Sequence, residues 1–419
     1  MRLLPLLVVL CAAHLSVVAA GQTIDPPGIA VRSIAAHRLA SYDELRERGS
    51  SAAYNLDYEG ARRDFEEMIR MQPENPVGPL YLATNVWLKS LNDARRLQSS
   101  LYNSDEFYVE SEEKVDSRVQ EQFRTLTRRA KTLAEERLKR DPRDVEALYL
   151  LGSIDGVKAA FSAAVERNFM SALRDGQRSV ERHREVLKLD PQYKDAEMTV
   201  GLYDYVVGDL PLAVKVLASL GGVRGSKKRG LATLERVARE GHWSRDHAKV
   251  VLIALFKREG RFAEAGAVAN EMAAAYPRNY LFRLEAADAL VSLAAQQRSA
   301  GNAAAKTERD AFATFETLLR DPAVRRIAPS LDLIHYRYGE ALLAADRPDL
   351  AAAQFRQSAA AAKAQEGMQT LAHLRAAQSL DLAGKRDEAL AHYRIAAARP
   401  NIYDSHAAAE KGLREPYRK

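Results

Sequence analysis

One spacing constrains the fold of this chain more than any other. A proline that ends one helix is followed, ten positions later, by a small residue inside the next helix. Proline cannot continue a helix because it lacks the backbone N–H, and alanine or glycine allows two helices to approach closely. Such a repetition predicts a stack of helix pairs that bury their apolar faces against their neighbours. The four instances are Pro73 and Ala83, Pro142 and Gly152, Pro191 and Gly201, and Pro277 and Ala287.

The composition favours helices throughout. Of the 419 residues, 47% are hydrophobic, and alanine, the best helix former, supplies many of them. The 22 glycines and 15 prolines fall mostly at the ends of segments, and no sustained alternation of apolar and polar residues indicates a strand. We therefore predict an all-α fold, a right-handed α-solenoid of about eight helix hairpins.

The first twenty residues have the pattern of a secretory signal. Arg2 precedes the apolar stretch 3–10, and the small residues Ala19 and Ala20 provide a cleavage site. We expect residues 1–20 to be removed and the mature chain to be periplasmic or secreted, with no integral membrane span. An uncleaved anchor helix is the alternative. Cys11, the single cysteine, would leave with the signal, which excludes disulfides and cysteine chemistry.

The charge balance gives little support to nucleic-acid binding. The net charge is +6, from 62 basic and 56 acidic residues, which is typical of a solvated surface of mixed sign. We predict no nucleic-acid partner, no cofactor and no metal. His242 and His247 are five positions apart, whereas a zinc-binding helix places its histidines four apart.

Several segments carry a more detailed repeat. Residues 42–55 and 59–71 read as a helix pair in which Ala61, Phe65 and Met68 share one face. The order resembles the tetratricopeptide repeat, a 34-residue helix-turn-helix unit. Three later segments match it at the following residues: Leu252, Ile253, Phe256, Gly260, Ala265, Ala269, Met272 and Pro277; His335, Tyr338, Gly339, Leu342, Ala351, Phe355 and Ser358; His373, Ala377, Leu380, Gly384, Ala389, Tyr393 and Ala396.

The resemblance sets the expected organisation. Residues 21–40 form a lead-in, repeats fill 41–220 and 221–400, and 401–419 is a tail. An acidic and aromatic insertion, 91–117, interrupts the first set and is either a surface crossover or a flap that contacts a ligand.

A glycine-rich turn at 221–230 forms a second break. Its surroundings are similar to the tetratricopeptide family of eukaryotic inclusion-body clearance, which implies architecture rather than catalysis. Ser226 and Lys227 stand where that family has an acidic residue. The matching residues are Leu210, Pro211, Gly221, Gly222, Gly225, Gly230 and Leu231.

The same turn is also a candidate anion site. Backbone N–H groups and cations ahead of a helix can bind a phosphate, through Arg224, Lys227, Lys228 and Arg229. Leu231 and Ala232 follow where a phosphate-binding loop needs lysine and then serine or threonine, so a flexible basic turn is the alternative.

The remaining candidate is the concave face that the repeat resemblance implies. Its first helices line the inner curve at positions three before, one after and four after the small residue. Aromatic side chains there suit an extended peptide or a partner helix, although each could equally be a core residue. We predict a non-enzymatic scaffold of a bacterial envelope that binds a protein or peptide partner; the alternative is an exported protein that binds a small molecule or anion at 221–230. The predicted binding residues are Trp87, Tyr149, Tyr205, Lys257, Tyr336 and Glu340.

Overall fold

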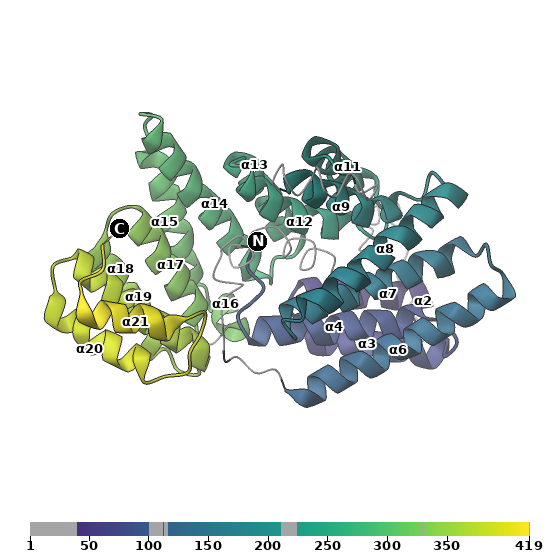
Figure 1. Cartoon of the computed structure of the whole chain (residues 1–419), viewed down its shortest axis with the longest axis horizontal. Coiled ribbons are helices and arrows are strands. Elements are labelled where there is room, and N and C mark those ends of the chain that lie inside the picture. Colours follow the sequence, from purple (N-terminus) through teal and green to yellow (C-terminus); the bar gives the residue numbers. More distant parts are fainter. Residues whose placement is uncertain (1–39, 100–111, 113–115, 211–223, 329, 419) are drawn as a thin grey trace, which may run out of the picture.

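The structure is a computed structural model that describes residues 40–99, 112, 116–210, 224–328 and 330–418. Every regular element among these residues is a helix, and eighteen are α-helices. In Figure 1, α14 to α21 form one lobe, α2 to α8 form a second, and α9 to α13 lie between and above them.

The helices of these ranges form eight consecutive antiparallel hairpins, which confirms the predicted α-solenoid. Three further short elements are the 3-10 helix η2 (Lys194–Ala196), α16 (Pro322–Ile327) and α21 (Ser405–Arg414). The α21 helix lies where only a tail was expected. The hairpins are α2 (Tyr42–Tyr54) with α3 (Tyr58–Met71), α4 (Val77–Asp93) with α6 (Ser117–Arg140), α7 (Val145–Ala164) with α8 (Phe169–Leu189), α9 (Glu197–Asp209) with α11 (Lys227–Glu240), α12 (Arg245–Arg258) with α13 (Phe262–Ala275), α14 (Tyr280–Ser299) with α15 (Ala305–Arg320), α17 (Asp332–Ala344) with α18 (Pro348–Ala360), and α19 (Glu366–Leu382) with α20 (Arg386–Ala397).

The four prolines act as the spacing predicts. Each lies two positions after the last residue of a helix, beyond Met71, Arg140, Leu189 and Ala275. Side-chain caps fix several of the starts: Ser41 and Glu44 form a reciprocal capping box at α2, and Asp57 accepts a hydrogen bond from the N–H of Gly60 at α3. Local sequence therefore determines where several of the hairpins begin or end.

Glycine and an aromatic ring make the closest contacts between paired helices. A Cβ at Gly49 would lie 2.5 Å from the ring of Phe65, and one at Gly339 would lie 2.7 Å from the ring of Phe355. Each pair is sixteen positions apart, and both rings are fully buried. The small residue thus creates the space that the aromatic side chain of the second helix fills.

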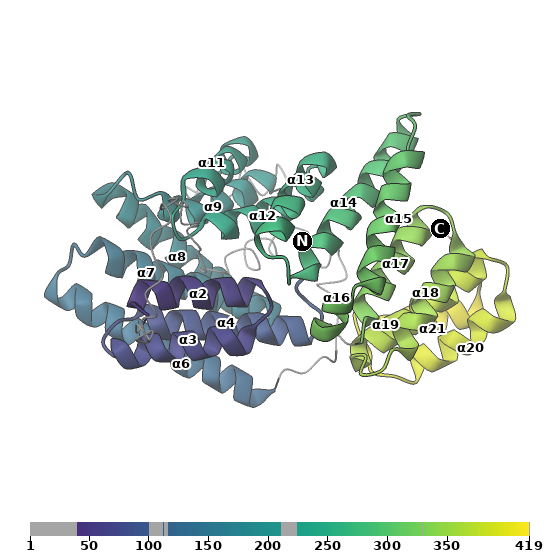
Figure 2. The same ribbon diagram turned by 180° about the vertical axis from the view of Figure 1, so that it is seen from behind.

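The first hairpin also contacts the fifth and sixth hairpins, far along the chain. Tyr54 stacks on Tyr276 with the ring centres 4.7 Å apart, and the Asn279 side chain donates to the carbonyl of Tyr54 at 2.7 Å. The backbone N–H of Arg278 donates to the Asn55 side chain at 3.1 Å. Figure 2 shows the molecule from this side, with α2 in front. The solenoid therefore closes on itself between α2 and the α13–α14 turn.

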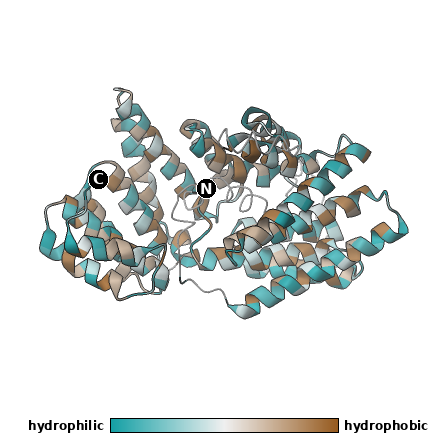
Figure 3. Ribbon diagram, viewed as in Figure 1, coloured by the Kyte–Doolittle hydropathy of each residue, from teal (hydrophilic) through white to brown (hydrophobic). Residues whose placement is uncertain are grey.

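This closure joins helices α2 to α8 and parts of α12 to α14 in one hydrophobic core. A single cluster of buried residues contains members from α2 to α8 together with Ile253, Met272, Tyr276 and Phe282. The outer surfaces of α6 and α8 are mainly hydrophilic, as the teal colour in Figure 3 shows. Among the described residues, no helix has the length and apolar character needed to cross a membrane.

The glycine contacts can be tested by adding one methyl group. We expect Gly339→Ala to lower the free energy of unfolding by about 1–3 kcal/mol, because the buried ring of Phe355 has little room to move. Gly266→Ala is the matched control, since its Cβ would lie 3.6 Å from Ala289, and it should raise stability by about 0.5–1 kcal/mol. Urea unfolding measures both values, and equal effects would contradict the close packing.

Candidate functional site

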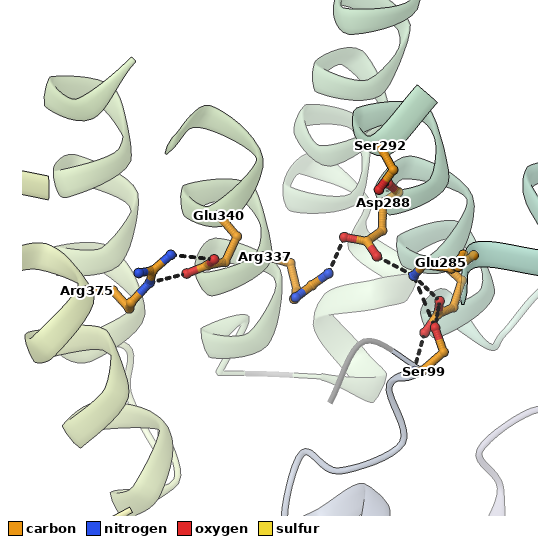
Figure 4. A network of polar contacts seen from close by, with 8 residues as sticks. Ser99, Glu285, Asp288, Ser292, Arg337, Glu340 and Arg375 are labelled. Carbon is orange, nitrogen blue, oxygen red and sulfur yellow. Dashed lines mark hydrogen bonds and ion pairs between the residues drawn. The ribbon is translucent and has the colours of Figure 1, made fainter. Parts of the chain in front are cut away.

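A row of ion pairs, in two separate groups, lies on the inner face of the C-terminal hairpins. We call it the inner-face network and define it as Lys257, Glu285, Asp288, Arg337, Glu340 and Arg375. Figure 4 shows Arg337 pointing toward Asp288, and Arg375 pointing toward Glu340. The side chains of the network come from α12, α14, α17 and α19.

Lysine and arginine side chains connect the helices pairwise. Lys257 donates to Glu285 Oε2 at 2.9 Å and also contacts Asp288, so it joins α12 to α14. Arg337 donates to the other oxygen of Asp288 and joins α14 to α17. Arg375 donates through Nε and Nη2 to the two oxygens of Glu340 at 2.6 and 2.7 Å. This two-pronged pair connects α17 to α19 and fixes the orientation of both side chains.

The spacing along each helix explains how the network forms. Glu285 and Asp288 are three positions apart, as are Arg337 and Glu340. Residues three apart lie on the same face of a helix, so each helix can contact the helix before it and the helix after it. Arg375 continues the pattern by donating to Gln378 at 2.8 Å, also three positions further on.

The surroundings of the network strongly favour the charged forms. Burial alone would raise the pKa of Asp288, but Arg337 and Lys257 overcome this and hold the pKa at about 2. Burial likewise opposes the charge on Lys257, yet Asp288 and Glu285 raise its pKa above the usual value. Asp288 and Lys257 therefore keep their charges over the whole neutral range.

A segment of the chain itself, Arg95–Ser99, lies against this face. Ser99 donates its backbone N–H to Glu285 Oε1 at 2.8 Å and its hydroxyl to Glu285 Oε2 at 2.5 Å. Lys257 donates to the same hydroxyl at 3.1 Å. Arg95 donates to Asp332 Oδ1 and to Ser330 Oγ, both at 3.0 Å. The segment follows α4, so the chain passes from the second hairpin to the inner face of the sixth and seventh.

The predicted insertion 91–117 begins within the last turn of α4, and most of it lies outside the described residues. Its described parts cross to the C-terminal hairpins. Glu112 accepts a hydrogen bond from the N–H of Asn401 and donates its own N–H to the Asn401 carbonyl, each at 2.8 Å. These contacts show a crossover, while contact of the insertion with a ligand stays a prediction.

Three of the predicted binding residues are core residues, and their assignment to a groove is wrong. Trp87 and Tyr149 are each 2% exposed and Tyr205 is 0% exposed. Trp87 and Tyr149 belong to the core cluster that also contains Tyr54 and Tyr276. Tyr205 belongs to a neighbouring core cluster, and its hydroxyl donates to Glu259 at 2.6 Å. An aromatic residue at these positions therefore stabilises the fold rather than contacting a partner.

The other three predicted residues do lie on the inner face. Lys257 and Glu340 are members of the network, and half-buried Tyr336 meets the edge of the Phe355 ring at 5.4 Å. Sequence reasoning missed Glu285, Asp288, Arg337 and Arg375. A sequence signal exists for three of them, Glu285, Arg337 and Arg375. Each is a charged residue two positions before a small residue, namely Ala287, Gly339 and Ala377.

Two of the four candidate cations of the basic turn, Lys227 and Arg229, are already paired with carboxylates. Lys227 Nζ is 2.8 Å from an Asp209 oxygen and 2.6 Å from a Glu259 oxygen, and Arg229 is paired with Asp204. A phosphate would have to compete with these carboxylates, so the predicted anion-binding role of Lys227 and Arg229 is not supported. Arg224 and Lys228 are among the residues of the turn that the structure describes, whereas residues 221–223 lie outside the described part of the chain.

The repeat histidines have structural partners. His335 Nδ1 is 2.8 Å from Gln354 Oε1. At positions 38 residues later, His373 Nδ1 is 2.9 Å from His392 Nδ1. The two pairs occupy the same place in successive hairpins, as the sequence predicts. Across the residues that the structure describes, no group of three or more histidine, cysteine, aspartate or glutamate side chains is arranged to hold a metal ion.

Comparisons with known proteins bear on the fold alone. No protein-family model matches the chain, and no curated protein matches it. Among solved structures, the chain is similar to a human IFIT1 dimer with m7Gppp-AAAA, at 14% identity and a TM-score of 0.46, over 89% of this chain and 81% of that chain.

Two other similar structures are tetratricopeptide-repeat proteins. A thermophilic one from Thermus thermophilus has 20% identity and a TM-score of 0.34 over 49% of this chain and 98% of that chain. A protein from Parabacteroides merdae has 14% identity and a TM-score of 0.31 over 80% and 98%. With TM-scores this low, the assignment of the fold rests on the eight hairpins themselves. The resemblance of the central segment to the inclusion-body clearance family stays a prediction.

The network can be tested through Asp288. We expect Asp288→Asn to lower the free energy of unfolding at pH 7 by about 3 kcal/mol, because Lys257 and Arg337 would then face each other without the carboxylate. Since the pKa is depressed in the folded chain, this stabilisation is present above about pH 4 and is lost as the pH falls toward 2. Melting temperatures between pH 5 and pH 2 should therefore fall less steeply in the variant.

Asp349→Asn is the control for this experiment. Asp349 pairs with Lys385 on the surface, where 62% of the aspartate side chain is exposed. The change should alter stability by no more than about 1 kcal/mol. Equal losses in the two variants would show that the network contributes no more than a surface pair.

Proposed function

We propose that this protein is a non-enzymatic scaffold that binds a protein or peptide partner through the inner face of α14, α17 and α19. The observation that carries the proposal is that this face already binds a segment of polypeptide. Glu285 accepts the backbone N–H of Ser99 as well as its hydroxyl. A contact to the backbone does not depend on one particular side chain, so a chain from a partner can make it equally well.

The balance of charge indicates how such a partner would be held. The network contains three cations, Lys257, Arg337 and Arg375, and three carboxylates. Its net charge is zero, so long-range attraction contributes little to binding. Affinity would come from desolvated hydrogen bonds and from apolar contact, and the alternating charges would set the register of the partner.

The partly exposed end of the network is the part most accessible to a partner. Side chains of Glu340 and Arg375 are 27% and 24% exposed, and half-buried Tyr336 lies one turn before Glu340. An aromatic ring beside a fixed ion pair offers a large contact area together with directional hydrogen bonds. We assign the centre of the binding face to these three residues.

The location in the bacterial envelope is part of the same proposal. It rests on the secretory pattern of residues 1–20, which lie outside the described part of the chain. An exported protein without thiols would keep its structure in an oxidising compartment. The solenoid would then present its inner face to other proteins of the envelope.

Export can be tested directly. Expression of the whole chain in a bacterial host should release a mature protein from the periplasm, and its first residue should be Gly21. Ala20→Leu should reduce cleavage, because the signal peptidase of the host requires small residues just before the cleavage site. A mature chain that still begins at residue 1 and stays in the cytoplasm would contradict the envelope role.

The binding face can be tested with an ion-pair exchange. A random-peptide phage library is selected on the purified wild-type chain, and the enriched peptides are measured by fluorescence anisotropy. The double variant Glu340→Arg/Arg375→Glu keeps an ion pair in place but reverses its direction. We expect it to unfold like the wild type and to bind the peptides at least tenfold more weakly.

The matched control is the same exchange in a surface pair of the second helices, Arg356→Glu/Glu388→Arg, whose side chains are about half exposed. It should leave peptide binding unchanged. Peptides that bind all three proteins equally would show that the inner face is not the binding site. A library that yields no enriched peptide would count against the proposed function itself.

A further inference from the structure

The Arg95–Ser99 segment is bound in the manner of a short peptide ligand. Its two ends are held by polar groups, Arg95 by Asp332 and Ser330, and Ser99 by Glu285 and Lys257. Its middle residue, Leu97, is partly buried and packs against two separate hydrophobic clusters. Polar anchors at both ends with an apolar side chain between them are typical of a recognised peptide.

The pocket for Arg95 is a specific site for a guanidinium group. Asp332 is 1% exposed, and Arg95 supplies it with a positive charge. The orientation of the Asp332 carboxylate is fixed by other donors. Its Oδ1 accepts from the Ser330 hydroxyl and the Leu333 N–H, and its Oδ2 accepts from the Gln365 N–H. A buried carboxylate that is held so firmly favours a planar cation with two donors over a flexible one.

The serine end is similarly complete. Glu285 receives both donors of Ser99, and the Lys257 ammonium donates to the oxygen of the same hydroxyl. Glu285 and Lys257 also belong to the inner-face network, so the segment occupies one end of the proposed binding face. Glu340 and Arg375 form a separate ion pair further along the same face, as Figure 4 shows.

We propose that Arg95–Ser99 is a ligand in cis, and that a partner polypeptide with the same chemistry competes for its site. The partner segment would carry an arginine, an apolar residue two positions later and a serine four positions after the arginine. This inference rests on the proposed function, because it names the sequence that the face recognises. Because the segment is part of the same chain, its effective concentration is high, on the order of millimolar for a short linker, and it limits the affinity of any competing segment.

The experiment uses a fluorescein-labelled peptide with the sequence of residues 93–100, DARRLQSS. The anisotropy of the peptide is measured with the full mature chain and with the double variant Arg95→Ala/Ser99→Ala. In this variant the chain's own segment 95–99 loses the side-chain contacts that hold it in the site. We expect the double variant to bind the peptide at least tenfold more tightly than the wild type. Ser99→Ala alone, which removes one hydroxyl, should give a smaller gain in affinity for the peptide. This single variant replaces the double variant in the experiment if the double variant does not fold.

Changes in the peptide provide a control that cannot disturb the fold. A peptide with alanine at the positions of Arg95 and Ser99 should lose at least tenfold in binding. Replacing the Gln98 position should have little effect, because that side chain contacts the carbonyl of Arg95 within the segment itself. Glu285→Gln in the double variant should also weaken binding.

The outcomes separate the two proposals. Equal peptide binding by the wild type and the double variant, or binding that ignores both alanine replacements, would overturn the competition in cis. If library peptides still bind through Glu340 and Arg375 in that case, the proposed function stands and only this inference fails. If neither peptide class binds to any form of the chain, both are wrong.

Discussion

The contact between the first hairpin and the α13–α14 turn determines how the rest of this structure is used. A solenoid is held together mainly by neighbouring repeats, and its inner face is ordinarily open. Here Tyr54 stacks on Tyr276, and Asn279 donates to the backbone of Tyr54. Tyr54 and Tyr276 also belong to one core cluster with residues from α2 to α8. We therefore place the proposed binding site on the inner face of α14, α17 and α19.

The two parts of the inner face differ in chemistry for a physical reason. The closed part can be apolar, because its side chains contact one another and exclude water. The C-terminal part faces outward more, and its charged side chains keep some contact with solvent: Asp288, Glu340 and Arg375 are each exposed by a fifth or more. Partial exposure lowers the cost of desolvation that full burial of six charges would impose. The pairs then fix the relative positions of the helices at a smaller cost in stability.

The sequence predicts what depends on neighbouring residues. Proline and a small residue ten positions later mark the hairpins, since helix termination and close approach are local effects. Glu340 and Lys257 were found on the inner face by the same reasoning, because repeat position determines the face of a helix. The groove prediction for Tyr149 is wrong because its ring packs between His183 and Tyr193, and its hydroxyl lies 3.3 Å from that of Ser244, 95 positions along the chain. Tyr54 and Tyr276 are 222 positions apart, and no repeat pattern indicates that they meet.

The pairing of charges cannot be predicted from the sequence for a related reason. Lys227 is part of a basic run, which suggests a site for anions when only the run is considered. Its partners, Asp209 and Glu259, come from the preceding helix and the following hairpin, so the fold compensates the charge. The same holds for Arg95, whose partner Asp332 is 237 positions away.

The closure and the binding of Arg95–Ser99 are linked through the chain. The segment directly follows α4, and α2, α3 and α4 pack in one unit whose first helix contacts the α13–α14 turn. Closure therefore brings the segment to α14, where Glu285 and Lys257 receive it. A ligand in trans that displaces the segment removes some of the contacts that hold the N-terminal hairpins against α14. By thermodynamic reciprocity, if the ligand weakens the closure by a given factor, loss of the closure strengthens binding of the ligand by that same factor.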